Sequence, residues 1–294
     1  MNNPEANSGR IWEIGLIDSA WHGSKFAGHA GHVQARQIGY EALDLFVGYD
    51  PGRLSGGERE RLIDEVGEVG LPVRSVIATS LGLNDFNPAV RDFHIARACS
   101  VIDLGAELGT VRNLLFVPGE YMFQRKLLPS QSEWEAVVDA VRTVGRHAGE
   151  RGLDVAIELL PFEHAFIATI HDMERLLDSV GLANVQAAID VSHLWLQRIP
   201  AAEIRRLAGR VAQVHIADCD GEHHGDLPPG RGTTPFADYL AVLNEIGYRG
   251  SASVELEFPE HPDQMIDWVS EAYRSTREIL VSTGLRPDLA RGSE

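Results

Sequence analysis

From residue 11 onward, short apolar runs rich in β-branched residues alternate with longer stretches of helical period. This alternation is typical of repeated strand-helix units, whose strands pair in parallel under a cover of helices. Eight runs are expected to form strands: Ile11–Ile17, Ala42–Val47, Val73–Thr79, Asn113–Val117, Asp154–Leu160, Val185–Ile189, Val211–Ala217 and Ser251–Glu257. Eight helical stretches accompany them, over residues 32–39, 57–68, 88–107, 131–151, 170–180, 201–208, 236–246 and 263–283. We therefore predict an α/β fold, a single closed (β/α)8 TIM barrel.

An open, doubly wound sheet is the alternative that this alternation allows. Such a sheet normally carries a glycine-rich phosphate-binding turn after its first strand, and the segment from Asp18 to Gly23 is not such a turn. No linker or low-complexity segment divides the chain. We expect one catalytic domain over residues 10–285, with flexible ends over residues 1–9 and 286–294.

The composition narrows the classes of partner. The net charge is −17, from 43 acidic against 26 basic residues, and no basic stripe is present that could neutralise a phosphodiester backbone, so a nucleic acid partner is not expected. No run reaches the ~18 consecutive apolar residues of a membrane span, and the first residues lack a secretory signal pattern. The expected location is the cytoplasm. Cys99 and Cys219 have no partner spacing and are expected to be reduced thiols.

Four predicted strands carry polar residues near their carboxyl ends, where TIM barrels place their catalytic groups. Glu158 lies in the fifth strand, Asp190 follows the sixth, His215 lies in the seventh and Glu255 in the eighth. Buried carboxylates in neighbouring strands repel one another strongly unless a cation is bound between them. We therefore predict that these four side chains hold one divalent metal ion.

The predicted ligand set consists of three carboxylates and one imidazole. Hard oxygen donors favour manganese, magnesium or cobalt, of which manganese is our first expectation. Glu257 is an alternative to Glu255, because alternation with period two puts both on one face of the strand. We prefer Glu255, since it lies closer to the middle of its apolar run, and expect Glu257 to lie outside the ligand shell.

Other residues near the predicted mouth of the barrel are candidates for substrate contact. Trp21 and His22 follow the first strand and either contact a sugar or pack in the core. Glu120 lies beyond the fourth strand and is a weaker candidate. The loop of residues 220–226 is dense in potential ligands and either binds a second metal, closes over the substrate or is simply solvated.

At these residues the sequence resembles the xylose isomerase-like TIM barrels, which include sugar phosphate isomerases and epimerases, inosose dehydratase and endonuclease IV. The elements that carry the resemblance are Glu158, Asp190-Val-Ser-His193, Val214-His215-Ile-Ala-Asp218, Pro229-Gly-Arg-Gly232 and Ser253-Val-Glu255, and it covers roughly residues 11–283.

The resemblance implies that the four predicted ligands match the family's metal ligands. It also implies that His193 and Arg231 lie near the substrate, with Asp218 a further candidate, and that the protein forms a homo-oligomer or associates with another subunit. His164 stands where ketose epimerases carry a substrate-binding carboxylate, which is a departure from their pattern.

The predicted function is a metal-dependent isomerase or epimerase of a keto-sugar. Glu158 and Glu255 would remove and return a proton through a cis-enediolate that the metal stabilises. One alternative is a dehydratase or lyase that uses the same site on a keto-inositol or a 3-keto-glycoside. A phosphodiesterase like endonuclease IV is less favoured, because Thr79 ends the third strand where such enzymes need further histidines. A non-catalytic barrel that serves as a binding module is the last alternative.

Overall fold

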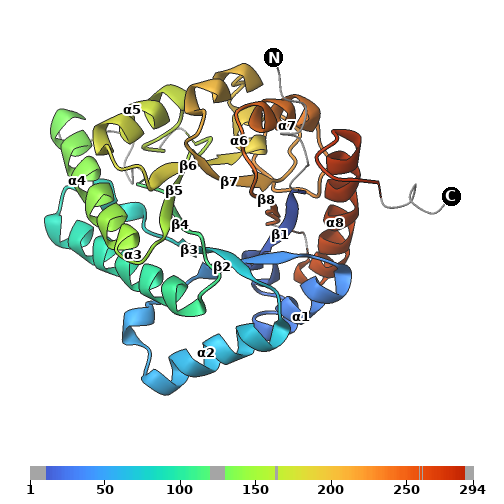
Figure 1. The fold of residues 1–294 in the computed structure, drawn as a ribbon, viewed down its shortest axis with the longest axis horizontal. Coiled ribbons are helices and arrows are strands. Elements are labelled where there is room, and N and C mark those ends of the chain that lie inside the picture. The colour runs from blue at the N-terminus through green and yellow to red at the C-terminus, as the bar shows by residue number, and fades with distance from the viewer. Residues whose placement is uncertain (1–10, 120–129, 163–164, 258, 260, 289–294) are drawn as a thin grey trace, which may run out of the picture.

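The computed structural model describes residues 11–119, 130–162, 165–257, 259 and 261–288. Eight parallel strands close into a barrel in chain order, each paired with the next and β8 with β1. Figure 1 shows the strands arranged as a ring, with the helices outside it. The predicted (β/α)8 barrel is confirmed. The strands are β1 Glu13–Ile17, β2 Ala42–Val47, β3 Val73–Ala78, β4 Asn113–Phe116, β5 Asp154–Glu158, β6 Val185–Asp190, β7 Val211–Ile216 and β8 Ser251–Val254.

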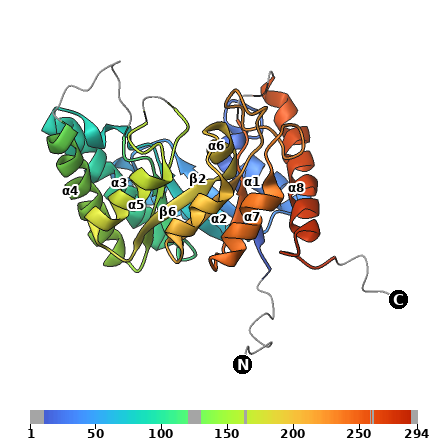
Figure 2. The same cartoon turned by 90° about the horizontal axis from the view of Figure 1, so that it is seen from above.

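The helices form the outer layer, as the side view in Figure 2 shows. The α-helices are α1 His29–Ile38, α2 Gly56–Val69, α3 Pro88–Leu108, α4 Ser130–Gly149, α5 Ile170–Val180, α6 Val191–Leu196, α7 Phe236–Glu245 and α8 Met265–Ser282. Short 3-10 helices are η2 Asp18–Trp21, η3 Pro51–Arg53, η4 Leu81–Asn84, η5 Ala201–Leu207 and η6 Pro262–Gln264. Within the described ranges, no helix combines the length and the apolar character that a membrane crossing requires.

Some elements of the structure differ from those expected, and the fifth strand ends at Glu158 rather than at Leu160. Residues 201–208 were expected to form an α-helix but form η5, a 3-10 helix of the kind that often serves as a connector. The six-residue helix α6 was not expected. The eighth strand was expected to reach Glu257 but ends at Val254, where its pairing with Leu16 of β1 also ends.

Two apolar clusters form the core of the protein. The larger one lies between the strands and the helices and contains most of the buried apolar residues. The smaller one consists of Ile17, Ile77, Leu115, Ala156 and Ala188, one residue from each of five strands. Successive side chains of a strand point to opposite faces, so residues two positions away share the face of this second cluster. Glu158 and Asp190 lie two residues beyond Ala156 and Ala188, and the fold therefore directs them inward at the carboxyl ends of the strands.

A close approach of α1 to Trp21 fixes the region after β1. Trp21 is completely buried and packs edge-on against Phe26, with ring centroids 5.7 Å apart. A Cβ atom at Gly31 would overlap the Trp21 ring and lie 2.5 Å from the carbonyl oxygen of Phe26. The absence of a side chain at Gly31 therefore allows α1 to pack on the tryptophan.

Gly31→Ala is expected to lower the free energy of unfolding by about 1–3 kcal/mol, because the ring or the helix must move to admit a methyl group. Gly67→Ala is the matched control, since a Cβ atom there meets nothing within 4 Å and the position lies inside α2. Alanine at this control position should raise stability by roughly 0.5–1 kcal/mol. Urea denaturation measures both changes, and equal stability of the two variants would contradict the packing argument.

Candidate metal centre

Four inward-pointing side chains meet at the carboxyl end of the barrel. Glu158 is the last residue of β5, Asp190 is the last of β6, His215 lies in β7 and Glu255 directly follows β8. Each of the four residues offers one ligand atom, and these four atoms all lie within 4.8 Å of one another. His215 Nδ1 lies 3.0 Å from Glu158 Oε1 and 2.9 Å from Glu255 Oε2. The structure thus brings together the four predicted ligands.

The hydrogen bonding of these atoms fits a bound cation. Glu158 Oε1, Asp190 Oδ2, His215 Nδ1 and Glu255 Oε2 are all buried, and none has a hydrogen-bond partner among the described residues. Leaving such a group unsatisfied in the interior costs about 1–3 kcal/mol, and more when it is charged. A divalent cation would satisfy all four at once, so the donor set fits a metal that is held by three carboxylates and an imidazole.

The strand-to-helix turn after β6 explains why only one oxygen of Asp190 remains for a cation. Asp190 is the N-cap of α6, and its Oδ1 accepts hydrogen bonds from the backbone amides of Ser192 at 2.6 Å and His193 at 3.1 Å. A side-chain oxygen at this position satisfies amides that the helix itself leaves free. Oδ2 is thereby left to face the other three ligand atoms.

The electrostatics of the cluster show how costly its charges are. Burial raises the pKa of Glu255, although the neighbouring His215 acts in the opposite direction. Burial alone would lower the pKa of His215, but the carboxylates of Glu255 and Glu158 outweigh it and raise this pKa well above its usual value. Burial and the same two carboxylates raise the pKa of Glu257 to about 7. Glu255 and Glu257 therefore resist ionisation unless further positive charge lies nearby.

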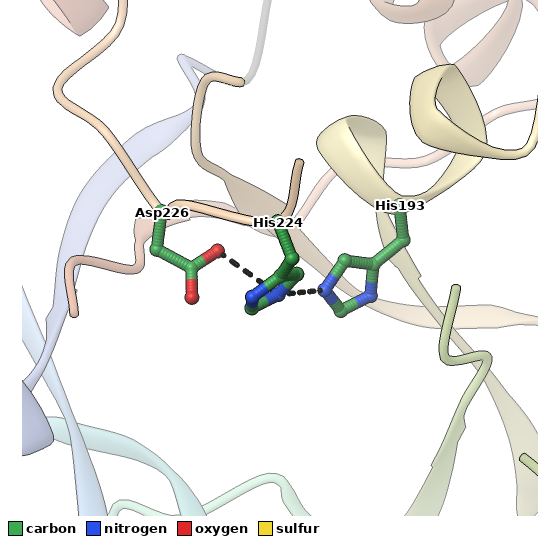
Figure 3. Close-up of side chains that lie close together, drawn as sticks. All are labelled: His193, His224 and Asp226. Carbon is green, nitrogen blue, oxygen red and sulfur yellow. Dashed lines mark hydrogen bonds and ion pairs between the residues drawn. The ribbon is translucent and has the colours of Figure 1, made fainter. Parts of the chain in front are cut away.

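A second cluster lies beside the first and consists of His193, His224 and Asp226 (Figure 3). His193 Nε2 lies 3.0 Å from His224 Nε2, which in turn lies 3.4 Å from Asp226 Oδ1. The other ring nitrogen of His193, Nδ1, lies 3.0 Å from the carbonyl oxygen of Leu159. Asp226 is 1% exposed, and its Oδ1 has no hydrogen-bond partner within the described part of the chain. Burial and the neighbouring His193 lower the pKa of His224 to about 4.

The loop after β7 was expected either to bind a second metal, to close over the substrate or to be solvated. The structure folds it back so that Asp218 and Leu227 pair as an isolated antiparallel bridge, which directs His224 and Asp226 inward. The density of histidine and acidic residues over 220–226 was the one sequence signal for ligands in this loop. It does not reveal which of these residues are buried. His223, by contrast, is exposed and contacts Asp220.

Asp218, predicted as a substrate contact, organises this loop through backbone amides. Its Oδ2 accepts hydrogen bonds from Gly230 and Gly232, both at 2.8 Å, and its Oδ1 accepts them from Cys219 at 2.9 Å and Thr234 at 3.0 Å. The carboxylate is 1% exposed. Both oxygens are therefore engaged in holding the loop over residues 218–234.

The remaining predicted contacts differ in their surroundings. Arg231 forms a two-pronged ion pair with Glu271, at 2.8 and 2.6 Å, and lies over the ring of Trp268. Trp21 is buried in the core, which matches the packing alternative, whereas His22 is exposed beside Phe46. Glu257 lies outside the four-ligand cluster. The last two candidates, Glu120 and His164, lie outside the described residues.

The sequence of this chain is similar to those of known proteins. Residues 33–278 match a family model described as xylose isomerase-like TIM barrel. D-psicose 3-epimerase of Ruminiclostridium cellulolyticum is 29% identical over 132 residues, which cover 44% of this chain and 43% of that protein. Fructoselysine 3-epimerase of Shigella flexneri is 21% identical over 76% of this chain and 82% of its own length. Inosose dehydratase of Bacillus anthracis is 24% identical over 57% and 60%. The chain thus spans less than half of the first of these relatives and most of the second.

Solved structures share the fold. D-allulose 3-epimerase from Methylomonas sp. superposes with a TM-score of 0.78 at 19% identity, over 92% of this chain and 98% of that one. The IOLI protein, whose crystal structure contains a zinc atom, superposes with a TM-score of 0.79 at 16% identity, over 92% and 99%.

Asp218→Asn is expected to destabilise the protein by about 1–3 kcal/mol, because the amide nitrogen of asparagine cannot accept the two backbone hydrogen bonds that one carboxylate oxygen now receives. Glu222→Gln, an exposed change in the same loop, should stay within roughly 0.5 kcal/mol of the wild type. Thermal unfolding measures stability, and limited proteolysis reports loop opening. Equal protease resistance of all three proteins would contradict the assigned role of Asp218.

Proposed function

Because the chain belongs to the xylose isomerase-like TIM barrel family, we propose that it is a divalent-metal-dependent epimerase or isomerase of a keto-sugar. The observation that carries this proposal is the set of four buried ligand atoms that lie together and have no hydrogen-bond partner in the part of the chain that the structure describes. The named epimerases among its relatives support the reaction class. The donor set, with three carboxylates and one imidazole, favours manganese, with magnesium or cobalt as alternatives.

Glu158 and Glu255 are the proposed proton-transfer residues. They approach His215 Nδ1 from β5 and from the end of β8, at 3.0 and 2.9 Å. A carboxylate has two oxygens, so each residue can hold the cation with one and exchange a substrate proton with the other. The bound metal supplies a Lewis acid that stabilises negative charge on the substrate oxygens.

The stereochemical outcome depends on where the proton returns. Removal by one carboxylate and return by the other, on the opposite face of the same carbon, inverts that centre and gives epimerisation. Return at the adjacent carbon gives isomerisation. The placement of Glu158 and Glu255 on different strands supports the first outcome.

The proposed substrate is a small carbohydrate that carries a carbonyl group. His193 is a proposed substrate contact, and the distance of 4.0 Å between its Nδ1 and Glu158 Oε1 supports this role. For Arg231 to reach the substrate, its ion pair with Glu271 would have to open. We further expect a cytoplasmic homo-oligomer; the exposed Leu81, Phe86 and Phe93 provide apolar surface for such an assembly.

Two alternatives have support of their own. The inosose dehydratase relatives favour a lyase, in which the same proton removal is followed by loss of a neighbouring hydroxyl group. The cluster of His193, His224 and Asp226 is the one observation that favours a phosphodiesterase, because such enzymes use two or more metal ions. An acidic chain with a net charge of −17 disfavours a nucleic acid substrate.

Glu158→Gln and Glu255→Gln should each abolish the incorporation of solvent deuterium into keto-sugar substrates, because an amide cannot accept the proton. The exposed Glu245→Gln serves as control and should exchange at the wild-type rate. Mass spectrometry in heavy water measures exchange across a panel of ketoses, and loss of mass by one water would identify the lyase. A Glu158 or Glu255 variant with near-normal exchange would exclude that residue from the mechanism.

Treatment with a chelator should abolish activity, and manganese should restore it. An epimerase of the proposed kind should bind one metal per chain, since four ligands from one barrel hold it. Elemental analysis of the reloaded protein and of the His224→Ala variant measures this stoichiometry. Two metals in the wild type and one in His224→Ala would contradict the single-metal proposal and favour the phosphodiesterase.

A further inference from the structure

Gln213 lies directly behind the imidazole of the candidate metal ligand. Both residues belong to β7, two positions apart, and are therefore on the same inner face of the barrel. Gln213 is 2% exposed and His215 is 1% exposed. The amide nitrogen of Gln213 lies 3.0 Å from His215 Nε2, while His215 Nδ1 faces Glu158 and Glu255. The amide oxygen of Gln213 is buried without a hydrogen-bond partner among the described residues.

The chemistry of a metal-bound imidazole fixes where its hydrogen must lie. The nitrogen that binds a cation must present a lone pair, so a neutral imidazole that binds through Nδ1 carries its hydrogen on Nε2. This N–H is buried and requires an acceptor. Among the described residues, His215 Nε2 makes its hydrogen-bond contact with the side-chain amide of Gln213.

We propose that Gln213 is a positioning residue that accepts a hydrogen bond from His215 Nε2 through its side-chain oxygen and so holds the ring with Nδ1 free for the metal. The inference rests on the proposed metal site. It requires the amide in the opposite orientation to the one in the structure, where the nitrogen faces the ring. The two ends of an amide have nearly the same shape, so a half-turn exchanges donor and acceptor without moving the chain.

The orientation of the amide decides whether both of its polar ends are satisfied. With its oxygen toward the ring, Gln213 accepts from Nε2, and Nδ1 is available to a cation. The buried amide oxygen, which has no hydrogen-bond partner among the described residues when the nitrogen faces the ring, then gains one. The register neighbour of Gln213 in β6 is Ala188, whose methyl side chain offers no competing polar group.

Metal affinity tests this assignment. Gln213→Leu keeps the approximate volume but removes the acceptor, and the manganese dissociation constant should rise about 10–100-fold, as partners of metal-bound histidines typically show. Gln213→Glu retains an acceptor and should bind manganese at least as tightly as the wild type. Gln186→Leu is the matched control, because that glutamine lies in β6 and contacts Asp154 instead; its affinity should be unchanged. Competition with a chelator measures all four proteins.

The position of the hydrogen gives a second test that needs no variant. In the zinc-loaded wild-type protein, nitrogen NMR should show His215 with hydrogen on Nε2 and the metal on Nδ1. Hydrogen on Nδ1, or a Gln213→Leu affinity equal to that of the wild type, overturns the assignment of Gln213 alone. A wild-type protein that binds no metal overturns the proposed function and this inference together, so the two failures are distinguishable.

Discussion

Mutual repulsion among buried carboxylates is the constraint on which the rest of the structure depends. Glu158, Asp190 and Glu255 present oxygens to one point at the mouth of the barrel, together with a ring nitrogen of His215. In a medium of low polarity such charges repel strongly, and only positive charge at their centre makes the arrangement favourable. Keeping these groups together lowers the stability of the fold, which is typical of a functional site and not of a structural core.

The barrel places these groups by strand register. Glu158 pairs with Ala188, Asp190 pairs with His215, and His215 pairs with Ser253, so that each ligand stands at or two residues beyond the position paired with its neighbour. A slip of one residue in any of these strands would turn its ligand from the inside of the barrel to the outside. The apolar residues of the inner cluster hold this register, and the metal site thus depends on packing deeper in the barrel.

The dependence of the site on both local patterns and distant contacts determines which of its parts could be predicted from the sequence. The alternation of short apolar runs with helical stretches was sufficient to predict the barrel, and the polar residues near the ends of four of these runs were sufficient to group the four ligands, because both are local patterns. The burial of His224 and Asp226 could not be predicted, since it depends on the bridge between Asp218 and Leu227 and on the amides around Gly230, contacts that no local pattern reveals. The short helix after Asp190 was missed because its N-cap is also the predicted ligand.

Asp190 links the two clusters of the mouth. One of its oxygens accepts the backbone amide of His193, which lies in the first turn of α6, and the other faces the candidate cation. The position of the His193 ring, and through it the contact with His224, is therefore set by the same carboxylate that would bind the metal. A shift of Asp190 on metal binding would move α6 and His193 with it. The candidate metal centre and the candidate substrate-contact residues are therefore joined by hydrogen bonds between groups that are almost completely buried, Asp190, His193 and His215 among them, although they lie at the carboxyl end of the barrel.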